Sequence, residues 1–250
     1  MLFFNVEVFM SLFDSWLVNK YIAHRGFHNE DAPENTISAF ERAIEQGYAI
    51  ELDVQAISDG TAVVFHDTRL SRLTGKDGYI KNLKAEELKE YHILDTVNTI
   101  PTLQEALDHI NGRTPVLIEI KPHGKVGDLE SSIVKILKDY KGDVAIQSFN
   151  PYILEWFLHN APHILRGQLS SYFEDTKLSF IKKYCIKKMI FNKKAKPDFI
   201  AYDANNLPNR YVKKYKELPL LAWTVRSQSE YLKIAGHCDN IIFENFKPSI

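Results

Sequence analysis

The chain has 250 residues, of which 45% are hydrophobic and 25% are charged, and its formal net charge is −1. This composition is that of a globular protein long enough to bury a large core, and it excludes a disordered chain. It also excludes the overall positive charge on which nucleic-acid binding usually depends, so no nucleic-acid partner is expected. The two cysteines, Cys185 and Cys238, are too few for a disulfide framework and are expected to be buried thiols.

The N-terminal segment is rich in Leu, Phe and Val, but Asp14 interrupts it, no Lys or Arg precedes it and no small-residue cleavage site follows. A signal peptide is therefore not expected. Apolar residues recur there at helical spacing, namely Phe9, Leu12, Phe13, Trp16 and Leu17. The pattern predicts an amphipathic helix within residues 1–20 that lies across the bottom of a barrel, with a membrane-surface helix as the alternative. No later run approaches the roughly twenty apolar residues that span a bilayer, so we expect a soluble, cytoplasmic protein.

Short apolar runs typical of buried strands recur along the chain, at 21–23, 49–54, 116–120, 144–147, 164–169, 199–202, 220–225 and 240–243. Helical patterns separate most of them, at 36–46, 129–138, 152–159, 210–216 and 229–234. Alternation of strand and helix predicts an α/β fold with a parallel sheet, and eight such repeats favour a (β/α)8 TIM barrel that forms a single domain over residues 1–250. An open doubly wound sheet is the alternative fold, but Gly26 lacks the companion glycines of a phosphate-binding loop.

Residues 57–101 interrupt this alternation. A Ser58-Asp59-Gly60 turn is followed by a short strand at 62–65, a loop with two glycines and a helical pattern at 85–91. We interpret this segment as an insertion after the second strand. Loops that follow barrel strands form the catalytic face, so the insertion is expected beside the site.

Two acidic residues lie in the second predicted strand. Glu51 and Asp53 are one residue apart within an apolar run, and the two-residue period of a strand directs both carboxylates to the same face. Buried carboxylates need positive partners, and oxygen ligands favour Mg²⁺ or Ca²⁺ over softer metals. A pair of acids in structural salt bridges is the alternative.

A similar pattern occurs in the third main strand, where Glu119 and Lys121 alternate near the C-terminal end of the run 116–122. The segment adds a third carboxylate and a cation to the same rim. Three acids for a metal ion and a lysine for phosphoryl oxygens are what a metal-bound phosphate requires.

Two histidines follow predicted strands. The first strand leads into His24-Arg25-Gly26, and the short strand of the insertion leads into His66. Imidazoles titrate near neutral pH, so the two can transfer protons to and from reacting oxygens, and Arg25 is suited to bidentate contact with phosphate. Each histidine taken singly is more often structural, and a lone Gly26 is as often a plain turn.

The segment 181–196 carries seven lysines and no acidic residue, and Ile181, Cys185 and Met189 recur in it at helical spacing. It is either a solvated helix face or a surface that contacts anionic lipid headgroups or steers anionic substrates.

Taken together, the motifs resemble those of the glycerophosphodiester phosphodiesterase family in its bacterial form. The matching segments, in the family's order and spacing, are His24-Arg-Gly26, Pro33-Glu-Asn-Thr36, Glu51-x-Asp53, Asp59-Gly60, His66-Asp67 and Glu119-x-Lys121. The similarity continues through Ile100-Pro-Thr-Leu103, Gln147-Ser-Phe-Asn150 and Trp223-Thr-Val225 and covers nearly the whole chain from Tyr21. The last strand departs from the family pattern, since Glu244-Asn245 stands where a Thr-Asp pair is usual.

The resemblance implies one divalent cation, Mg²⁺ or Ca²⁺ with Mn²⁺ as a further candidate, held by Glu51, Asp53 and Glu119. His24 and His66 would be the acid and base. The implied reaction is hydrolysis of a small glycerophosphodiester to sn-glycerol 3-phosphate and an alcohol, a step of lipid and glycerol metabolism. The attacking oxygen is either that of water or the glycerol 2-hydroxyl, which would give a cyclic phosphate first.

The resemblance also implies that Arg25 and Lys121 hold the phosphate and that Glu34 orients the site as a supporting acid. Trp223 packs beside the substrate or is a plain core residue, and helix capping accounts for most of the motif at 33–36.

Two alternative functions would use the same site. One is phosphodiester cleavage of lysophospholipids or phosphoinositides, and the other is binding of phosphate esters by the barrel without catalysis. A peripheral contact with an anionic membrane surface is the further partner considered, and no oligomeric state is predicted.

Overall fold

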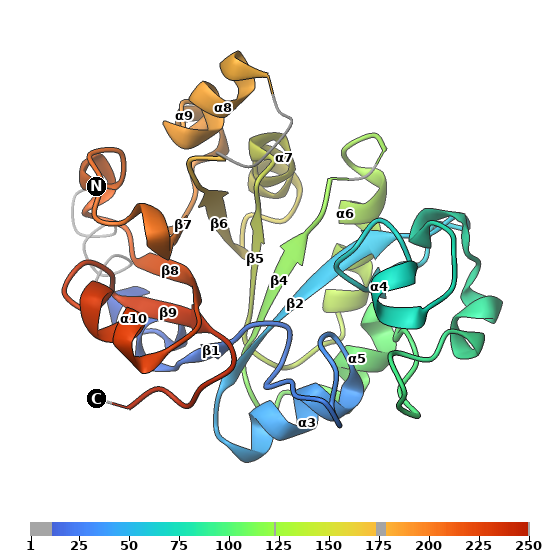
Figure 1. The fold of residues 1–250 in the computed structure, drawn as a ribbon. Coiled ribbons are helices and arrows are strands. Elements are labelled where there is room, and N and C mark those ends of the chain that lie inside the picture. Colours follow the sequence, from blue (N-terminus) through green and yellow to red (C-terminus); the bar gives the residue numbers. More distant parts are fainter. Residues whose placement is uncertain (1–11, 123, 174–178, 250) are drawn as a thin grey trace. The chain divides into compact units, whose positions relative to one another are not determined.

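The computed structural model describes residues 12–122, 124–173 and 179–249 (Figure 1). The chain divides into two compact units, one of residues 23–146 and one of residues 1–22 with 147–250. No helix within the described ranges is both long enough and apolar enough to cross a bilayer.

The unit of residues 23–146 is built on strand β2 (Ala49–Ala56), every residue of which is buried. Strand β4 (Val116–Ile120) pairs with β2 in parallel, and β3 (Ala62–Val64) pairs with it antiparallel. In the parallel register Asp53 lies opposite Glu119. Both faces of these strands are buried, which suits the apolar residues of β2 and β4 and makes their acidic residues exceptional.

Three helices cover this unit: α3 (Ile37–Glu45), α5 (Leu103–Ile110) and α6 (Asp128–Leu137). Thr36 caps α3, because its hydroxyl accepts a hydrogen bond from the backbone N–H of Ala39 at 3.3 Å. At α5, Thr102 and Glu105 form a capping box. Helices α3 and α5 pack against each other, as Figure 1 shows.

The insertion contains β3 and three short helices, α4 (Ser71–Thr74), η1 (Ile80–Asn82) and η2 (Ala85–Glu90). Its apolar residues form a small core of their own, made of Ile57, Val63, Phe65, Leu70, Leu73, Ile80, Leu83, Leu88, Ile93 and Ile100. The helix expected at 85–91 is the 3-10 helix η2, a geometry that proteins use in short connecting pieces. The separate core fixes the insertion next to the end of β2 without a long regular element.

Gly26 sits where no other residue fits. Its φ is +79°, and a Cβ atom at this position would lie 2.8 Å from the backbone carbonyl carbon of Ala39 in α3. The next residue, Phe27, donates its N–H to the carbonyl of Ala39 at 3.0 Å. Gly26 is thus required for the close packing of the segment after β1 (Ile22–Ala23) on α3. Interpreting it as a plain turn leaves this packing requirement out.

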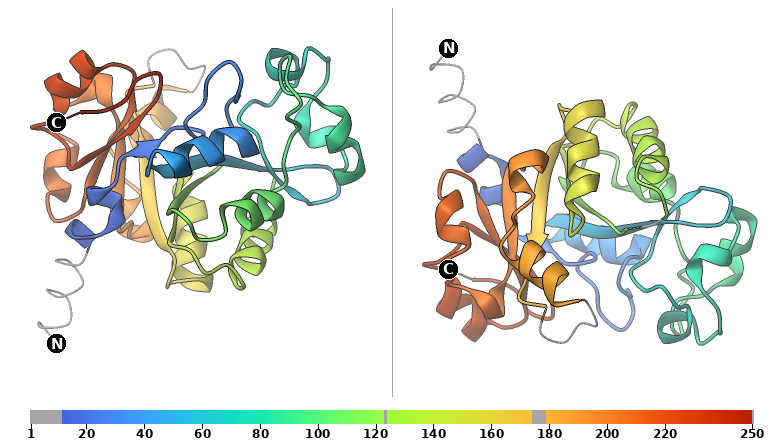
Figure 2. Two further views of the ribbon diagram at one scale, coloured as in Figure 1. Left: turned by 90° about the horizontal axis from the view of Figure 1, so that it is seen from below. Right: turned by 90° about the horizontal axis from the view of Figure 1, so that it is seen from above.

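The second unit contains the parallel strands β6 (Leu165–Ser170), β7 (Phe199–Asp203), β8 (Leu220–Val225) and β9 (Asn240–Phe243). Strand β5 (Val144–Ser148) lies where the chain passes from one unit to the other. The helices are α2 (Trp16–Asn19), α7 (Pro151–Asn160), α8 (Phe180–Lys187), α9 (Asn192–Ala195) and α10 (Gln228–Ile234), with 3-10 turns η3 (Ala204–Asn206) and η4 (Val212–Tyr215). Helix α7 packs against β6 and α9 (Figure 2). The strand and helix order along the chain is that of the (β/α)8 barrel, the predicted fold class.

Several local expectations need correction. The helix expected at 210–216 is only the 3-10 turn η4, and the lysine-rich helix ends at Lys187, so Met189 lies outside it with a φ of 51° and is buried. Near the N-terminus, Phe9 lies outside the described residues, and the chain turns at Ser15 before the one-turn helix α2. Asn240 donates hydrogen bonds to the carbonyls of Leu17 and Lys20, both at 2.7 Å, which ties this segment to β9.

The two cysteines are free, and both are only partly buried, so the expectation of buried thiols is wrong. Burial, together with the charge of Asp239, raises the pKa of Cys238 to about 12. Its sulfur donates weakly to the carbonyl of Ile234 at 3.5 Å. Cys238 therefore remains a protonated, unreactive thiol at neutral pH.

Candidate active site

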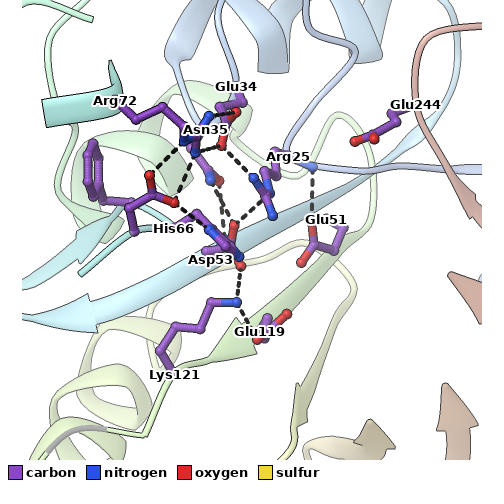
Figure 3. A network of polar contacts seen from close by, with 12 residues as sticks. Arg25, Glu34, Asn35, Glu51, Asp53, His66, Arg72, Glu119, Lys121 and Glu244 are labelled. Atoms are coloured by element: carbon purple, nitrogen blue, oxygen red, sulfur yellow. Dashed lines mark hydrogen bonds and ion pairs between the residues drawn. The ribbon is translucent and has the colours of Figure 1, made fainter. Parts of the chain in front are cut away.

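Three buried carboxylates meet in the unit of residues 23–146. Glu51 and Asp53 project from one face of β2, and Glu119 reaches the same place from β4 (Figure 3). Their ligand oxygens lie within 4.8 Å of one another, and the three residues are 1%, 0% and 7% exposed. The strand period thus brings together the three acids that the sequence singled out.

Glu51 is the least compensated member of this cluster. One carboxylate oxygen, Oε2, accepts a hydrogen bond from the backbone N–H of Arg25 at 2.9 Å, whereas the buried Oε1 has no hydrogen-bond partner among the described residues. Burial, and then repulsion from Asp53 and Glu119, raises the pKa of Glu51 well above its ordinary value. A buried acceptor with this environment fits a hard divalent cation, which carboxylate oxygens bind well.

Two cations neutralise part of the cluster's charge. The ammonium of Lys121 lies 2.8 Å from Asp53 Oδ1 and also contacts the carboxylate of Glu119, while Nε of Arg25 lies 3.2 Å from Asp53 Oδ2. Burial alone would raise the pKa of Asp53, but the charges of Lys121 and Arg25 outweigh it and hold this pKa below its ordinary value. Three carboxylates are thus paired with two cations, so the ionised cluster has an excess of negative charge that a further cation could neutralise.

Asn35 connects the segment after β1 to strand β2. Its side-chain amide donates to Asp53 Oδ2 at 2.8 Å, and its oxygen accepts the backbone N–H of Asp53 at 3.2 Å. Its own N–H donates to the carbonyl of Arg25 at 2.9 Å, with a φ of 58°. Asn35 therefore orients Asp53 and is not the helix cap, a role that belongs to Thr36.

A chain of ion pairs joins the insertion to the cluster. His66 Nδ1 lies 2.7 Å from Asp67 Oδ1, and Arg72 contacts both oxygens of Asp67 at 2.6 and 3.0 Å. The same guanidinium contacts both oxygens of Glu34 at 2.7 and 2.8 Å, and Glu34 in turn accepts from Arg25 at 2.6 Å (Figure 3). Arg72 is thus a bidentate bridge between the acids that position His66 and Arg25.

Arg72 was not singled out from the sequence, because its short polar segment has no periodic pattern and resembles that of any surface arginine. Its effect on Asp67 is strong. Burial would raise the pKa of Asp67, but the hydrogen bonds from Arg72 and His66 lower it to about 2. Asp67 is therefore ionised throughout the neutral range and able to hold the imidazole.

Gln55 is a second residue that sequence reasoning missed. It is the next residue on the face of β2 that carries Glu51 and Asp53, and it is buried. Its amide nitrogen donates to the carbonyl of Phe65 at 2.6 Å and to that of Asp67 at 3.0 Å. These bonds fix the backbone on both sides of His66, and the two-residue period of β2 was the signal that could have revealed them.

His24 is partly buried and directly follows β1. Its charge and that of His66 both lower the pKa of Asp53, after the larger contributions of Lys121 and Arg25. Both imidazoles are therefore close enough to Asp53 to act on it electrostatically, and their role in proton transfer stays a prediction.

Trp223 belongs to the other unit and lies on β8. Its ring contacts that of Phe149 edge to face, with centroids 5.5 Å apart, and Phe149 contacts Phe173 at 5.6 Å. The role of Trp223 in substrate binding stays a prediction. In the same unit the atypical Glu244 is paired with Arg226, whose Nε lies 2.7 Å from Glu244 Oε1.

A buried acidic cluster beside a lysine and an arginine has the chemistry needed to bind a metal ion together with a phosphate group. Residues 24–246 match the model of the glycerophosphoryl diester phosphodiesterase family, so the chain belongs to this family. A glycerophosphodiester phosphodiesterase of Caldanaerobacter subterraneus is 40% identical over 163 residues, and one of Bacillus altitudinis is 34% identical over 160. These matches cover 59% of this chain in both cases but only 65% and 64% of the relatives, which is just under two thirds of their length.

Solved structures agree with the fold. A phosphodiesterase of Oleispira antarctica, in complex with the product sn-glycerol-3-phosphate, superposes with a TM-score of 0.74 at 27% identity and covers 91% of this chain and 93% of its own. A glycerophosphodiester phosphodiesterase of Thermotoga maritima gives a TM-score of 0.70 at 26% identity over 89% and 93% of the two chains. The predicted (β/α)8 barrel and the family resemblance are confirmed.

Proposed function

We propose that this protein is a metal-dependent phosphodiesterase that hydrolyses glycerophosphodiesters to sn-glycerol 3-phosphate and an alcohol. The observation that carries the proposal is the buried cluster of Glu51, Asp53 and Glu119, with Arg25 and Lys121 beside it. The names of the family relatives and the product bound to the Oleispira antarctica phosphodiesterase support the choice of substrate.

Glu51, Asp53 and Glu119 would hold one divalent cation, Mg²⁺ or Ca²⁺, with Mn²⁺ as a further candidate. The donor set consists only of carboxylate oxygens, and Oε1 of Glu51, which has no hydrogen-bond partner among the described residues, is the acceptor most in need of a cation. When bound, the ion supplies positive charge that offsets the negative charge of the phosphodiester.

Arg25 and Lys121 would bind the phosphate oxygens. Both now contact Asp53, and Lys121 also contacts Glu119, so each already points at the place where the acids converge. The guanidinium can form two parallel hydrogen bonds with phosphate, whereas the ammonium provides a compact point charge. Burial is expected to strengthen both interactions relative to water.

His66 and His24 would transfer the protons. Because Nδ1–H of His66 would donate a hydrogen bond to the ionised Asp67, the other ring nitrogen, Nε2, is the one left to accept or donate a proton during the reaction. One imidazole deprotonates the attacking oxygen, and the other protonates the alkoxide of the departing alcohol. Asp67 stabilises the protonated form of His66 as it arises.

The proposal is tested by incubating the protein with glycerophosphocholine and measuring sn-glycerol 3-phosphate enzymatically. After treatment with EDTA, Mg²⁺, Ca²⁺, Mn²⁺ and Zn²⁺ are added back separately. We expect no product without metal and recovery with one of the oxygen-preferring ions. Binding of glycerophosphocholine with no turnover under any metal would overturn the proposal in favour of a non-catalytic barrel, and activity confined to lysophospholipids or phosphoinositides would change the substrate class.

Replacing Arg72 with Lys is expected to lower kcat about 10-fold to 100-fold with a smaller change in KM, because lysine cannot bridge Asp67 and Glu34 bidentately. Without that bridge the pKa of Asp67 rises from about 2 toward its ordinary value, so the variant is expected to lose further activity at the acid end of the pH–rate profile, where Asp67 of the wild type stays ionised. Steady-state kinetics from pH 4 to pH 9 measure both effects.

Arg69→Lys is the matched control, because Arg69 lies three residues before Arg72 and contacts only Tyr79 among the described side chains of this unit. It should leave both kcat and the pH–rate profile unchanged. An Arg72→Lys protein with wild-type kinetics would show that the bridge does not position the catalytic groups.

A further inference from the structure

Helix α8 is unusual among the described helices because it is eight residues long and none of its residues is buried. Phe180 and Ile181 are 82% and 73% exposed, and Tyr184 is 45% exposed. These three residues share one face of the helix, at positions i, i+1 and i+4. Packing in a core does not explain them, so this apolar face is available at the surface.

Lysines surround these apolar side chains. The ammonium of Lys188 lies 3.9 Å from the ring centroid of Tyr184 and donates to its hydroxyl at 2.6 Å. The side chain of Lys214 reaches the carbonyl of Lys188 at 2.9 Å. Burial, and then the charges of Lys193 and Lys188, lowers the pKa of Lys214, which shows that these positive charges lie close together. We call Phe180, Ile181, Tyr184, Lys188, Lys193 and Lys214 the α8 face.

No acidic side chain of the local sequence offsets this charge. Residues 179–197 contain seven lysines and no Asp, Glu or Arg. Figure 1 shows that α8 and α9, which carry most of these lysines, are neighbours in the same unit. Clustered lysines without acids favour an anionic partner.

We propose that the α8 face binds the surface of an anionic phospholipid bilayer. Phe180 and Ile181 would enter the boundary between headgroups and acyl chains, and the lysines would contact the lipid phosphates. The combination of exposed aliphatic and aromatic side chains with a ring of lysines matches the general requirements for interfacial binding. This inference goes beyond the proposed phosphodiesterase activity and does not depend on it.

A nucleic acid is the less suitable polyanion. Stacking on bases would use Phe180 and Tyr184, but it has no use for the exposed Ile181, and the segment lacks the arginines that commonly contact phosphates and bases. Insertion into a lipid interface uses all three apolar side chains. The chemistry of the face therefore favours a membrane.

The experiment is co-sedimentation of the full chain with vesicles of phosphatidylcholine alone or of phosphatidylcholine with about one third phosphatidylglycerol, a content at which the surface is strongly negative. We expect binding to the anionic vesicles that weakens as salt is raised, and little binding to the neutral ones. The double variant Phe180→Ser/Ile181→Ser should bind at least about 10-fold more weakly. Lys188→Glu/Lys193→Glu should lose at least about 25-fold, since each lysine near such a surface contributes about fivefold.

Matched controls lie in the other unit. Val97 is 90% exposed, so Val97→Ser tests the loss of an exposed apolar side chain, and Lys84→Glu/Lys89→Glu tests charge reversal at exposed lysines. Both should bind vesicles as the wild type does. Equal binding by the wild type and the Phe180/Ile181 variant, or no preference for anionic vesicles, would overturn the proposal, as would binding to single-stranded RNA that exceeds binding to vesicles. Thermal unfolding checks that the variants fold, which the absence of buried residues in α8 leads us to expect.

Discussion

Replacing Glu51 with Gln is expected to abolish binding of the divalent cation and to lower kcat/KM on the order of 10²-fold to 10³-fold or more. The amide can still accept the hydrogen bond from the backbone of Arg25, so the local backbone should persist. What disappears is the carboxylate whose Oε1 lacks a hydrogen-bond partner among the described residues, and with it a negative ligand. Isothermal titration with Mg²⁺, Ca²⁺ and Mn²⁺ measures the loss directly.

Glu130→Gln is the control for this change. Glu130 is also buried, at 3% exposure, but it accepts a hydrogen bond from the backbone of Gly127 at the start of α6. Its replacement should leave metal affinity and turnover intact. Normal metal binding by the Glu51→Gln protein would show that the acidic cluster is not the ion site.

Glu51→Gln is also expected to preserve or raise the free energy of unfolding of the metal-free protein. The pKa of Glu51 is higher in the folded protein than in the unfolded chain, so protonated Glu51 favours folding and ionised Glu51 opposes it. The stabilisation from protonation is complete below the pKa of the unfolded chain and is lost as the pH rises through the pKa of the folded protein. A neutral amide in place of the Glu51 carboxylate removes that penalty. Chemical denaturation at neutral pH with EDTA present compares the two proteins, and a large loss of stability would contradict the electrostatic account of the cluster.

The second large effect concerns the imidazoles. His66→Ala is expected to lower kcat by about 10² to 10⁴, the usual contribution of a proton-transfer group, while metal affinity stays nearly unchanged. His24→Ala should behave in the same way. Kinetics with glycerophosphocholine at saturating metal, together with calorimetric titration of the ion, separate the loss of proton transfer from the loss of the metal.

His109→Ala serves as the control, since His109 lies in the same unit and pairs with Glu41 at 2.7 Å between α3 and α5. It should leave kcat unchanged. A His66→Ala protein with near-normal activity would show that the acid and base are assigned wrongly.

The strands were well predicted because their patterns are local. Each apolar run that was expected as a strand coincides with a strand of the structure, and the ends agree to within a few residues. The pattern of β2, with its two acids, indicated both the fold and part of the site. Helix α5 was not singled out, although Thr102 and Glu105 provide the sequence pattern of a capping box. The 3-10 turns were overestimated as helices, since apolar spacing over so few residues does not distinguish the two geometries.

The site was predicted only where strand periodicity or a motif applied. Glu51, Asp53 and Glu119 follow from alternation along β2 and β4. Arg72 could not be found in this way, because its partners Glu34 and Asp67 are brought to it by the folding of the insertion. Contacts between loops depend on tertiary packing, which leaves no period in the sequence.

The close approach of Gly26 to α3 has a consequence for judging relatives of this chain. Gly26 is required by backbone packing, and Asn35 and Gln55 hold the backbone around the acids. A homologue could retain these three residues, adopt the same barrel and match the family model, yet carry an amide at the position of Glu51. Such a homologue would still belong to the family, but by the roles proposed for the acids and imidazoles it would be inactive, so those residues, and not the glycine, predict whether a member is active.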